Sequence, residues 1–300
     1  MSSKSLTLSL RPRGNAIPHL PSEYTSSSSS STHDVYEGLS RTAKVSVHRL
    51  RLTKGSDGSF LPNSTDLTVN ATGLREQSVI YVKDLGPQIA WRTVFVLEYL
   101  GPLIIHPILY YFLTSSSPST LQTLTLTLIT LHFAKRELET LFIHRFSAAT
   151  MPLVNLPKNC AHYWLLSGLN LAYWTYVSSS PTARESNPWI TYPALVAWAV
   201  GEVGNLGTHV VLRNLRSHGG KERGVPTGWG FGTVTCPNYG FEVLVWVAVW
   251  ALTWSLSAGI FVAVAGVQMA LWARKKEGKY RREFGDKYKR KRSVMVPGLI

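Results

Sequence analysis

The stretch VLVWVAVWALTWSLSAGIFVAVAGVQMALWA, Val243–Ala273, runs for 31 residues without a charged side chain. One helix crosses the hydrocarbon core of a bilayer in about 20 residues, so this stretch is too long for a single span. Ser255–Gly259 is the segment at which we expect it to break in two. The stretch therefore predicts two consecutive membrane helices near the C-terminal end.

Further apolar segments precede this stretch and raise the expected number of spans to six. They are Thr93–Leu113, Ser119–Phe133, Ala161–Ser178 and Pro188–Val200. A large soluble all-helical core is the alternative interpretation of the same segments. The pattern favours a multi-span α-helical membrane protein with about six transmembrane helices.

Positive charge predicts the orientation of these spans. Arg274–Arg292 holds 11 Lys or Arg against three acidic residues, directly after the last span. The loop that we expect after the second span carries Lys135, Arg136, Arg145 and Lys158, and the one after the fourth carries Arg213, Arg216, Lys221 and Arg223. Lys and Arg concentrate on the cytosolic side of membrane proteins. With six spans both termini are then cytosolic, which agrees with the lack of an apolar signal segment in residues 1–30.

Composition separates a polar N-terminal part from an apolar remainder. The 300 residues are 45% apolar and 16% charged, with a net charge of +14 and a mean hydropathy of only +0.03. The apolar residues concentrate after Trp91. Cys160 and Cys236, the two cysteines, are far apart in sequence and suggest neither a disulfide framework nor a zinc site. We therefore expect no metal, and collagen, coiled-coil and wholly disordered classes are excluded.

The polar N-terminal part predicts a small α+β domain. Three segments have the alternating apolar and polar residues or the β-branched and aromatic content of strands: Leu6–Leu10, Val45–Leu52 and Ser78–Lys83. A short helix can begin in Asp34–Leu39. This order favours a ubiquitin-like (β-grasp) domain, with an unspecified α+β domain as the alternative. The six serines Ser26–Ser31 are interpreted as a flexible insertion. The expected domains are residues 1–86 (ubiquitin-like, cytosolic), 87–273 (transmembrane helical) and 274–300 (basic cytosolic tail).

Polar groups in or beside membrane spans are candidates for function because burying them is costly. Glu98 lies in the first span, with Gln88 before it. Near the end of the fourth, Asn205 and His209 share a helix face and follow Glu202. Arg213 and Arg216 continue this line, which can also be a satisfied interhelical hydrogen-bond network.

The Gly-rich loop 219–239 can approach phosphates or be an ordinary flexible loop. The basic tail can anchor to anionic lipid headgroups, close over a polyanionic cofactor, or bind nucleic acid, the option disfavoured next to a span.

A set of motifs in order along the chain resembles one known family. The segments are Leu85–Gln88, Glu98–Pro102, Lys135–Ser147, Asn205–Arg216, Cys236–Glu242 (CPNYGFE) and Tyr280–Pro297. Together they resemble the very-long-chain trans-2-enoyl-CoA reductases of the steroid 5-alpha-reductase family. Steroid reductases have a His-Tyr pair where this chain has His132-Phe133, so that tyrosine cannot be the proton donor here. A second departure is Val296-Pro297-Gly298, where the family commonly has Pro-Phe.

The resemblance implies an oxidoreductase of very-long-chain fatty acid elongation in the endoplasmic reticulum membrane. NADPH would reduce a trans-2-enoyl-CoA to the saturated acyl-CoA. Tyr239 is then the candidate acid or enolate donor, because the ordinary pKa of tyrosine, near 10, keeps its hydroxyl protonated at neutral pH. Gln88 is a candidate for a second group that polarises the substrate. The hydroxyl of Tyr239 can instead be bonded to a backbone carbonyl. The NADPH-binding residues that the resemblance implies are Asn205, His209, Arg213, Arg216, Asn238, Glu242 and Tyr280. Arg216 and Arg223 are the candidates for its phosphates, because arginine matches phosphate geometry.

The resemblance also implies partners and leaves other functions open. The expected partners are membrane lipids and other fatty acid elongation enzymes, and we expect no nucleic acid. A steroid or polyprenol reductase of the same family is the alternative enzyme. A membrane methyltransferase and a non-enzymatic transporter or scaffold are the alternatives outside it.

Overall fold

The computed structural model describes residues 4–114, 116–146, 148–217, 220, 223–291 and 293–299. Lys221 and Arg292, two of the basic residues from which the orientation of the spans was predicted, lie outside these ranges, as does Gly219 of the Gly-rich loop. The chain divides into two compact units. One comprises Met1–Ala90 with Ala149–Asn155, and the other comprises Trp91–Ala148 with Leu156–Ile300.

The first unit contains a five-stranded sheet and one α-helix. Its sheet order is β2-β1-β5-β3-β4, in which β1 and β5 are parallel and the other neighbours are antiparallel. The expected strands at Leu6–Leu10 and Ser78–Lys83 and the expected short helix are confirmed. The elements are β1 (Ser5–Pro12), β2 (Glu23–Ser27), α1 (Thr32–Ala43), η1 (Val47–Arg49), β3 (Leu50–Lys54), β4 (Phe60–Leu61), η2 (Asn70–Thr72) and β5 (Val79–Asp84).

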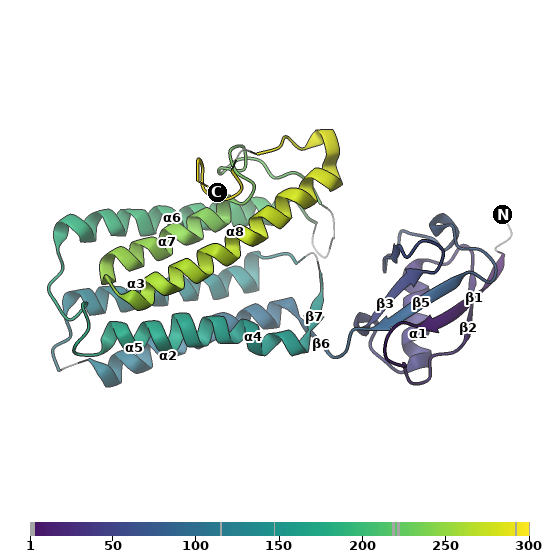
Figure 1. Ribbon diagram of the computed structural model, residues 1–300, viewed down its shortest axis with the longest axis horizontal. Helices are drawn as coiled ribbons and strands as arrows, with labels where there is room; N and C mark the ends of the chain where they lie inside the picture. Colours follow the sequence, from purple (N-terminus) through teal and green to yellow (C-terminus); the bar gives the residue numbers. More distant parts are fainter. Residues whose placement is uncertain are drawn as a thin grey trace. The chain divides into compact units, whose positions relative to one another are not determined.

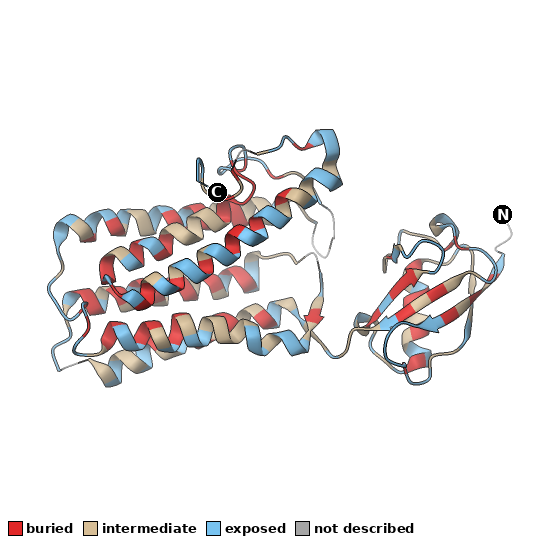
Figure 2. Cartoon of the chain, viewed as in Figure 1, coloured by how far each residue is buried: buried red, intermediate tan, exposed pale blue. Residues whose placement is uncertain are grey.

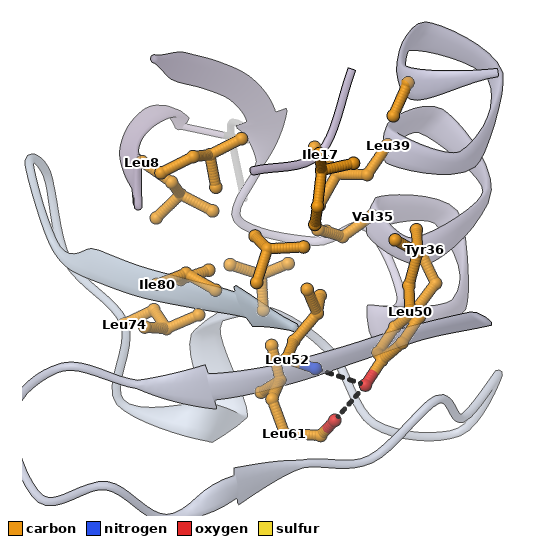
Figure 3. Packing of buried hydrophobic residues seen from close by; sticks show 14 of the residues in the cluster. Leu8, Ile17, Val35, Tyr36, Leu39, Leu50, Leu52, Leu61, Leu74 and Ile80 are labelled. Atoms are coloured by element: carbon orange, nitrogen blue, oxygen red, sulfur yellow. Dashed lines mark hydrogen bonds between the residues drawn. The ribbon is translucent and has the colours of Figure 1, made fainter. Parts of the chain in front are cut away.

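Alternation along the strands builds the core of this unit. Leu8, Leu52 and Ile80 are fully buried and point toward the apolar side of α1 (Figure 3). Tyr36 of α1 also lies in the core, where its hydroxyl donates to Leu61 O (2.8 Å) and accepts from Leu52 N (3.0 Å). Burial of apolar surface stabilises by about 25 cal/mol per Å², and the buried hydroxyl is satisfied.

Two expectations for this unit were wrong. Ser26 and Ser27 belong to β2, and Ser31 is the N-cap of α1, not part of a flexible insertion. Ser31 and Asp34 form a capping box, which satisfies backbone N–H groups at the helix start. The strand expected at Val45–Leu52 begins only at Leu50, because the preceding residues form the short helix η1.

The first unit should lose stability in acid through Asp84. Arg49 donates to both carboxylate oxygens of Asp84, at 3.0 and 2.5 Å, and holds the pKa of Asp84 below its ordinary value. A depressed folded-state pKa stabilises above the unfolded-state value, about 3.9, and this stabilisation is lost as the pH falls through the folded-state value. Asp84→Asn should therefore lower the free energy of local opening at neutral pH by up to about 1 kcal/mol, and amide hydrogen exchange in β3 and β5 should be faster as a result.

The difference between Asp84→Asn and wild type should shrink as the pH is lowered below about 4. Asp66→Asn is the matched control, because Asp66 is exposed and has no ion pair in the described part of the chain. Equal exchange rates for wild type and Asp84→Asn at neutral pH would contradict this account.

The second unit is a helical bundle. The helices α6, α7 and α8 pack in sequence order, and α2 packs against α3 and against the π-helical η5 (Figure 1). Trp246 and Phe261 lie at its centre, with ring centroids 4.6 Å apart. Its helices are α2 (Trp91–Leu113), α3 (Thr120–Leu138), η3 (Glu139–Ile143), α4 (Leu156–Ala161), η5 (His162–Asn170), α5 (Leu171–Tyr176), α6 (Pro188–Asn214), α7 (Pro237–Thr253), α8 (Leu256–Phe284) and η6 (Gly285–Lys287).

The long apolar stretch Val243–Ala273 does divide into two helices, at Trp254–Ser255, where the expected segment begins. Trp254 adopts a left-handed conformation with φ 49° and ends α7, and Ser255 precedes α8. The second expected span was too short, and α3 continues to Leu138 and then as η3. Lys135 and Arg136 are consequently helical and not loop residues. Favourable i, i+3 and i, i+4 pairs of opposite charge help the helix to continue through them.

Three of the described helical stretches are long and apolar enough to cross a membrane: Trp91–Leu113, Pro188–Asn214 and Leu256–Lys287. The helices of this unit also carry many exposed apolar side chains, and Figure 2 shows exposed residues along their outer faces. Trp189 is 89% exposed and Phe112 is 72% exposed. Large apolar side chains on an outer surface are typical of contact with lipid or with another protein.

Candidate active site

Close packing of α6 on α7 brings the predicted polar residues together. A Cβ atom at Gly201 would lie 2.6 Å from Val245 Cγ2, and one at Gly204 would lie 2.5 Å from the ring of Phe241. Side chains larger than hydrogen would separate the two helices at these positions. The glycines therefore set the short distance across which the next residue, Asn205, reaches α7.

Asn205, Asn238 and Glu242 meet at this contact. Asn205 Nδ2 donates to the backbone oxygen of Asn238 (3.0 Å) and to Glu242 Oε2 (3.1 Å). Asn205 and Asn238 are buried. The buried Oδ1 atom of Asn238 has no hydrogen-bond partner within the described ranges. These three residues were all predicted, and the structure places them in one cluster.

Residues of α3 extend the cluster, although they were not predicted as site residues. Lys135 Nζ lies 2.9 Å from Asn205 Oδ1 and 2.6 Å from Glu202 Oε2. The two ring nitrogens of His132 face Glu202 (2.7 Å) and Glu242 (3.2 Å). His132 thus joins carboxylates from α6 and α7. Charged groups of opposite sign, paired in this way, can be buried at an acceptable cost.

The other end of the cluster is organised around the buried Arg136. Its guanidinium donates to Glu139 and to the hydroxyl of Tyr99 (2.8 Å). His209 Nδ1 lies 3.0 Å from Glu139 Oε2 and 3.1 Å from Arg136 Nη1. Glu139 begins the π-helix η3, a rare conformation that is frequent at functional sites. His209 therefore lies on the Arg136 side of the cluster, whereas Asn205 lies on the Lys135 side.

Glu139, His144 and His209 place possible ligand atoms within 4.8 Å of one another, a spacing that a metal ion can bridge. The guanidinium of Arg136 contacts both Glu139 and His209. A fixed positive charge at this position repels a cation. Glu139 and His209 therefore belong to a network around Arg136, and the ring of His144 packs edge to face against that of His209.

The predicted arginines lie outside this cluster. Arg216 Nη1 donates to Arg145 O (2.6 Å), and Arg145 in turn contacts the backbone oxygens of Arg213 and Arg216. Arg216 Nε is buried without a partner in the described part of the chain. Arg223 pairs with Glu283 at 2.9 Å. The structure therefore does not bring Arg223 into contact with the other predicted arginines among the described residues.

Of the predicted tyrosines, Tyr280 belongs to α8, and Tyr239 lies near Trp272 of the same helix. Tyr239 is half-buried, and its ring centroid lies 6.5 Å from that of Trp272. No described residue forms a hydrogen bond with its hydroxyl, so the alternative of a carbonyl-bonded tyrosine finds no support here. Tyr280 packs edge to face against Phe284 and Tyr288, with Lys276 Nζ 5.7 Å from its ring centroid.

Gln88 lies in the first unit. It begins β6 (Gln88–Ala90), which pairs with β7 (Thr150–Pro152), and the 3₁₀-helix η4 (Leu153–Asn155) follows. Its amide nitrogen donates to Leu85 O and Gly86 O, both at 3.2 Å, and its oxygen accepts from Thr150 (3.1 Å). Its amide is thus engaged by its own strand and by β7.

A signal for the missed residues was present in the sequence. His132, Lys135, Arg136 and Glu139 recur at intervals of three or four, the spacing of one helix face. Ending the second span at Phe133 assigned the last three to a loop and hid this pattern. Phe133 itself, the departure from the steroid reductases, is fully buried beside Tyr99 and Trp246.

Comparisons with known proteins agree with these motifs. Residues 149–300 match the family described as 3-oxo-5-alpha-steroid 4-dehydrogenase. A Schizosaccharomyces pombe protein named as an enoyl reductase is 41% identical over 98% of this chain and 100% of its own length. A very-long-chain enoyl-CoA reductase of Dictyostelium discoideum is 39% identical over 92% of this chain and 94% of its own. A human trans-2,3-enoyl-CoA reductase-like protein is 31% identical over 91% of this chain and 78% of its own.

The motifs, the polar cluster between α3, α6 and α7, and identity along nearly the whole chain agree with one another. This chain belongs to the very-long-chain enoyl-CoA reductases, and its C-terminal half carries the domain that they share with the 3-oxo-5-alpha-steroid 4-dehydrogenases.

Proposed function

We propose that this protein reduces trans-2-enoyl-CoA to saturated acyl-CoA with NADPH, the last step of very-long-chain fatty acid elongation. The observation that carries the proposal is the buried cluster in which Asn205, Asn238 and Glu242 meet, directly beside Tyr239 in the chain. Reduction adds hydride to Cβ and a proton to Cα of the substrate. A site for this reaction must orient the two reactants, stabilise the enolate oxygen and supply the proton.

The donor and acceptor set fits a dinucleotide with a carboxamide and phosphates. Asn238 Oδ1 is a buried acceptor without a partner in the described part, and it suits a carboxamide N–H. Arg216 Nε is a buried donor without a partner there, and it suits a phosphate oxygen. We propose that Asn205, His209, Arg213, Arg216, Arg223, Asn238, Glu242 and Tyr280 hold NADPH. When bound, its nicotinamide supplies the hydride.

The chain's own residues then handle the proton and the enolate oxygen. The hydroxyl of Tyr239 has no partner among the described residues and is free to donate to the substrate. We assign it the role of acid or enolate donor. Gln88 is proposed as a second polarising group, and this requires its amide to exchange the contacts that it makes with Leu85 and Gly86.

The proposed setting is the endoplasmic reticulum membrane, with six spans and both termini cytosolic. The three long apolar helices support spans there, and the remaining helices of the bundle supply the others. The sheet order of the first unit and its parallel β1–β5 pair support a ubiquitin-like (β-grasp) domain, which favours the enoyl-CoA branch over steroid reductases. We propose that other elongation enzymes are its partners and that the basic tail closes on the cofactor site.

The test is oxidation of NADPH by the purified, detergent-solubilised protein given trans-2-hexadecenoyl-CoA. We expect substrate-dependent loss of NADPH absorbance and formation of hexadecanoyl-CoA, with NADH as the matched control for the cofactor. A steroid enone serves as the competing substrate. Reduction of the enone without reduction of any enoyl-CoA would overturn the proposal in favour of the steroid-type alternative.

A further inference from the structure

A buried carboxylate outside the proposed cofactor set joins three segments of the helical unit. Glu277 of α8 is 8% exposed, and its Oε2 accepts hydrogen bonds from Thr235 Oγ1 and Tyr288 Oη, both at 2.5 Å. Thr235 lies just before α7, and Tyr288 lies in the C-terminal tail. Burial, followed by the bond to Glu277, raises the pKa of Tyr288 above its ordinary value. Tyr288 is therefore the donor and Glu277 the acceptor.

The tail continues along the segment that leads into α7. Val234 forms a parallel bridge with Ser293, and Cys236 N donates to Val294 O at 2.8 Å. A Cβ atom at Gly240 would lie 2.7 Å from Met295 O, so the tail backbone lies directly against the first turn of α7. The positions of the tail and of this first turn are consequently linked.

The first turns of α7 carry three proposed site residues, Asn238, Tyr239 and Glu242. A shift of the segment at Thr235 would move all three relative to Asn205, to which two of them are hydrogen-bonded. Glu277 Oε1 is buried and has no hydrogen-bond partner among the residues described. The two hydroxyls are thus the groups that satisfy this carboxyl group among the residues described, and losing either leaves it with one hydrogen bond fewer in a buried position.

We propose that Glu277 is a positioning residue for NADPH, which it serves by holding Tyr288 of the tail and Thr235 against each other at the start of α7. This inference rests on the proposed function. The affinity for NADPH and the rate of turnover should respond differently to a defect at this position. A defect in the Glu277 cluster weakens NADPH binding, because the tail and the first turn of α7 lose their register in the free enzyme. Turnover at saturating NADPH is preserved, because bound NADPH selects the arrangement in which Asn205, Asn238 and Glu242 meet and Tyr239 is in place.

The experiment removes one hydroxyl at a time. Thr235→Val and Tyr288→Phe should each raise KM and Kd for NADPH about tenfold, with kcat within about twofold of wild type. Thr235→Ser keeps the hydroxyl and should restore both constants to within about twofold. Thr125→Val is the matched control, because the buried hydroxyl of Thr125 donates within its own helix to Leu121 O (2.7 Å).

Kd is measured by NADPH-dependent shift of the melting temperature as well as by kinetics. A purely structural role would lower the melting temperature and kcat of Thr235→Val without moving Kd, and this result would overturn the inference. Unchanged Kd in both hydroxyl variants would overturn it too, while leaving the proposed function intact. Failure of the wild type to bind NADPH would overturn the proposed function and this inference with it. Binding of NADPH without reduction of enoyl-CoA would remove the reaction alone, and the Kd comparison still decides the role of Glu277.

Discussion

Tyr239→Phe should lower the rate of enoyl-CoA reduction by about 10²- to 10⁴-fold, the range that a positioned general acid contributes. The substitution removes one hydroxyl and keeps the ring that packs near Trp272. Because no described residue bonds to that hydroxyl, its loss breaks no internal hydrogen bond in the described part, and the fold should be unaffected. The measurement is single-turnover oxidation of NADPH with saturating trans-2-hexadecenoyl-CoA.

NADPH binding must be measured beside the rate, since a collapsed site would also abolish turnover. The NADPH-dependent shift in melting temperature should be the same in Tyr239→Phe and wild type. Tyr192→Phe is the matched control, because Tyr192 is 68% exposed on α6 and should turn over at the wild-type rate. Turnover retained in Tyr239→Phe would move the acid elsewhere, with ordered water next to be tested as the proton source and Gln88 as the polarising group.

Arg136→Met should destabilise the helical unit by about 3 kcal/mol, the lower end of the range for breaking a buried ion pair. Arg136 is 8% exposed, and its removal leaves the Glu139 carboxylate and the Tyr99 hydroxyl without their shared partner. The loss stays at the lower end because Lys135 and His209 still contact Glu139, at 3.3 and 3.0 Å. Thermal unfolding in detergent micelles measures the change.

The double variant Arg136→Met/Glu139→Gln should recover part of this loss, because it removes the uncompensated charge. Arg184→Met is the control for loss of an arginine at an exposed position, and its free energy of unfolding should stay within about 0.5 kcal/mol of wild type. Equal unfolding temperatures for Arg136→Met and Arg184→Met would show that the network around Arg136 does not stabilise the unit.

Local sequence patterns were sufficient for much of the fold. The length of Val243–Ala273 required two helices, and the alternation at Leu6–Leu10 required a strand with one buried face. Boundaries were less predictable where a local device competed with composition. The capping box at Ser31 turned a serine run into a helix start, and the pairs that Lys135 and Arg136 form with Glu139 help α3 to continue past its expected end at Phe133.

The residues of the candidate site were likewise predictable only in part. Asn205, Asn238 and Glu242 were predicted from polarity in an apolar context and from the family motif, and they do meet. Lys135 and Arg136 were not assigned to the site, because their role depends on α3 continuing past Phe133. His132 lies inside the expected span and was missed because its partners are on α6 and α7. Arg223 was grouped with Arg216 by charge alone, whereas the structure pairs it with Glu283.

The sequence by itself determined which segments are apolar enough to enter a membrane, which alternate as strands, and which motifs place the chain among the enoyl-CoA reductases. These properties depend on residues close together in the chain. Only the tertiary structure decided which polar groups are partners. A charge can be buried only beside a group that compensates it, and for Lys135 and His132 those groups lie on α6 and α7, about 70 and 110 residues further along the chain.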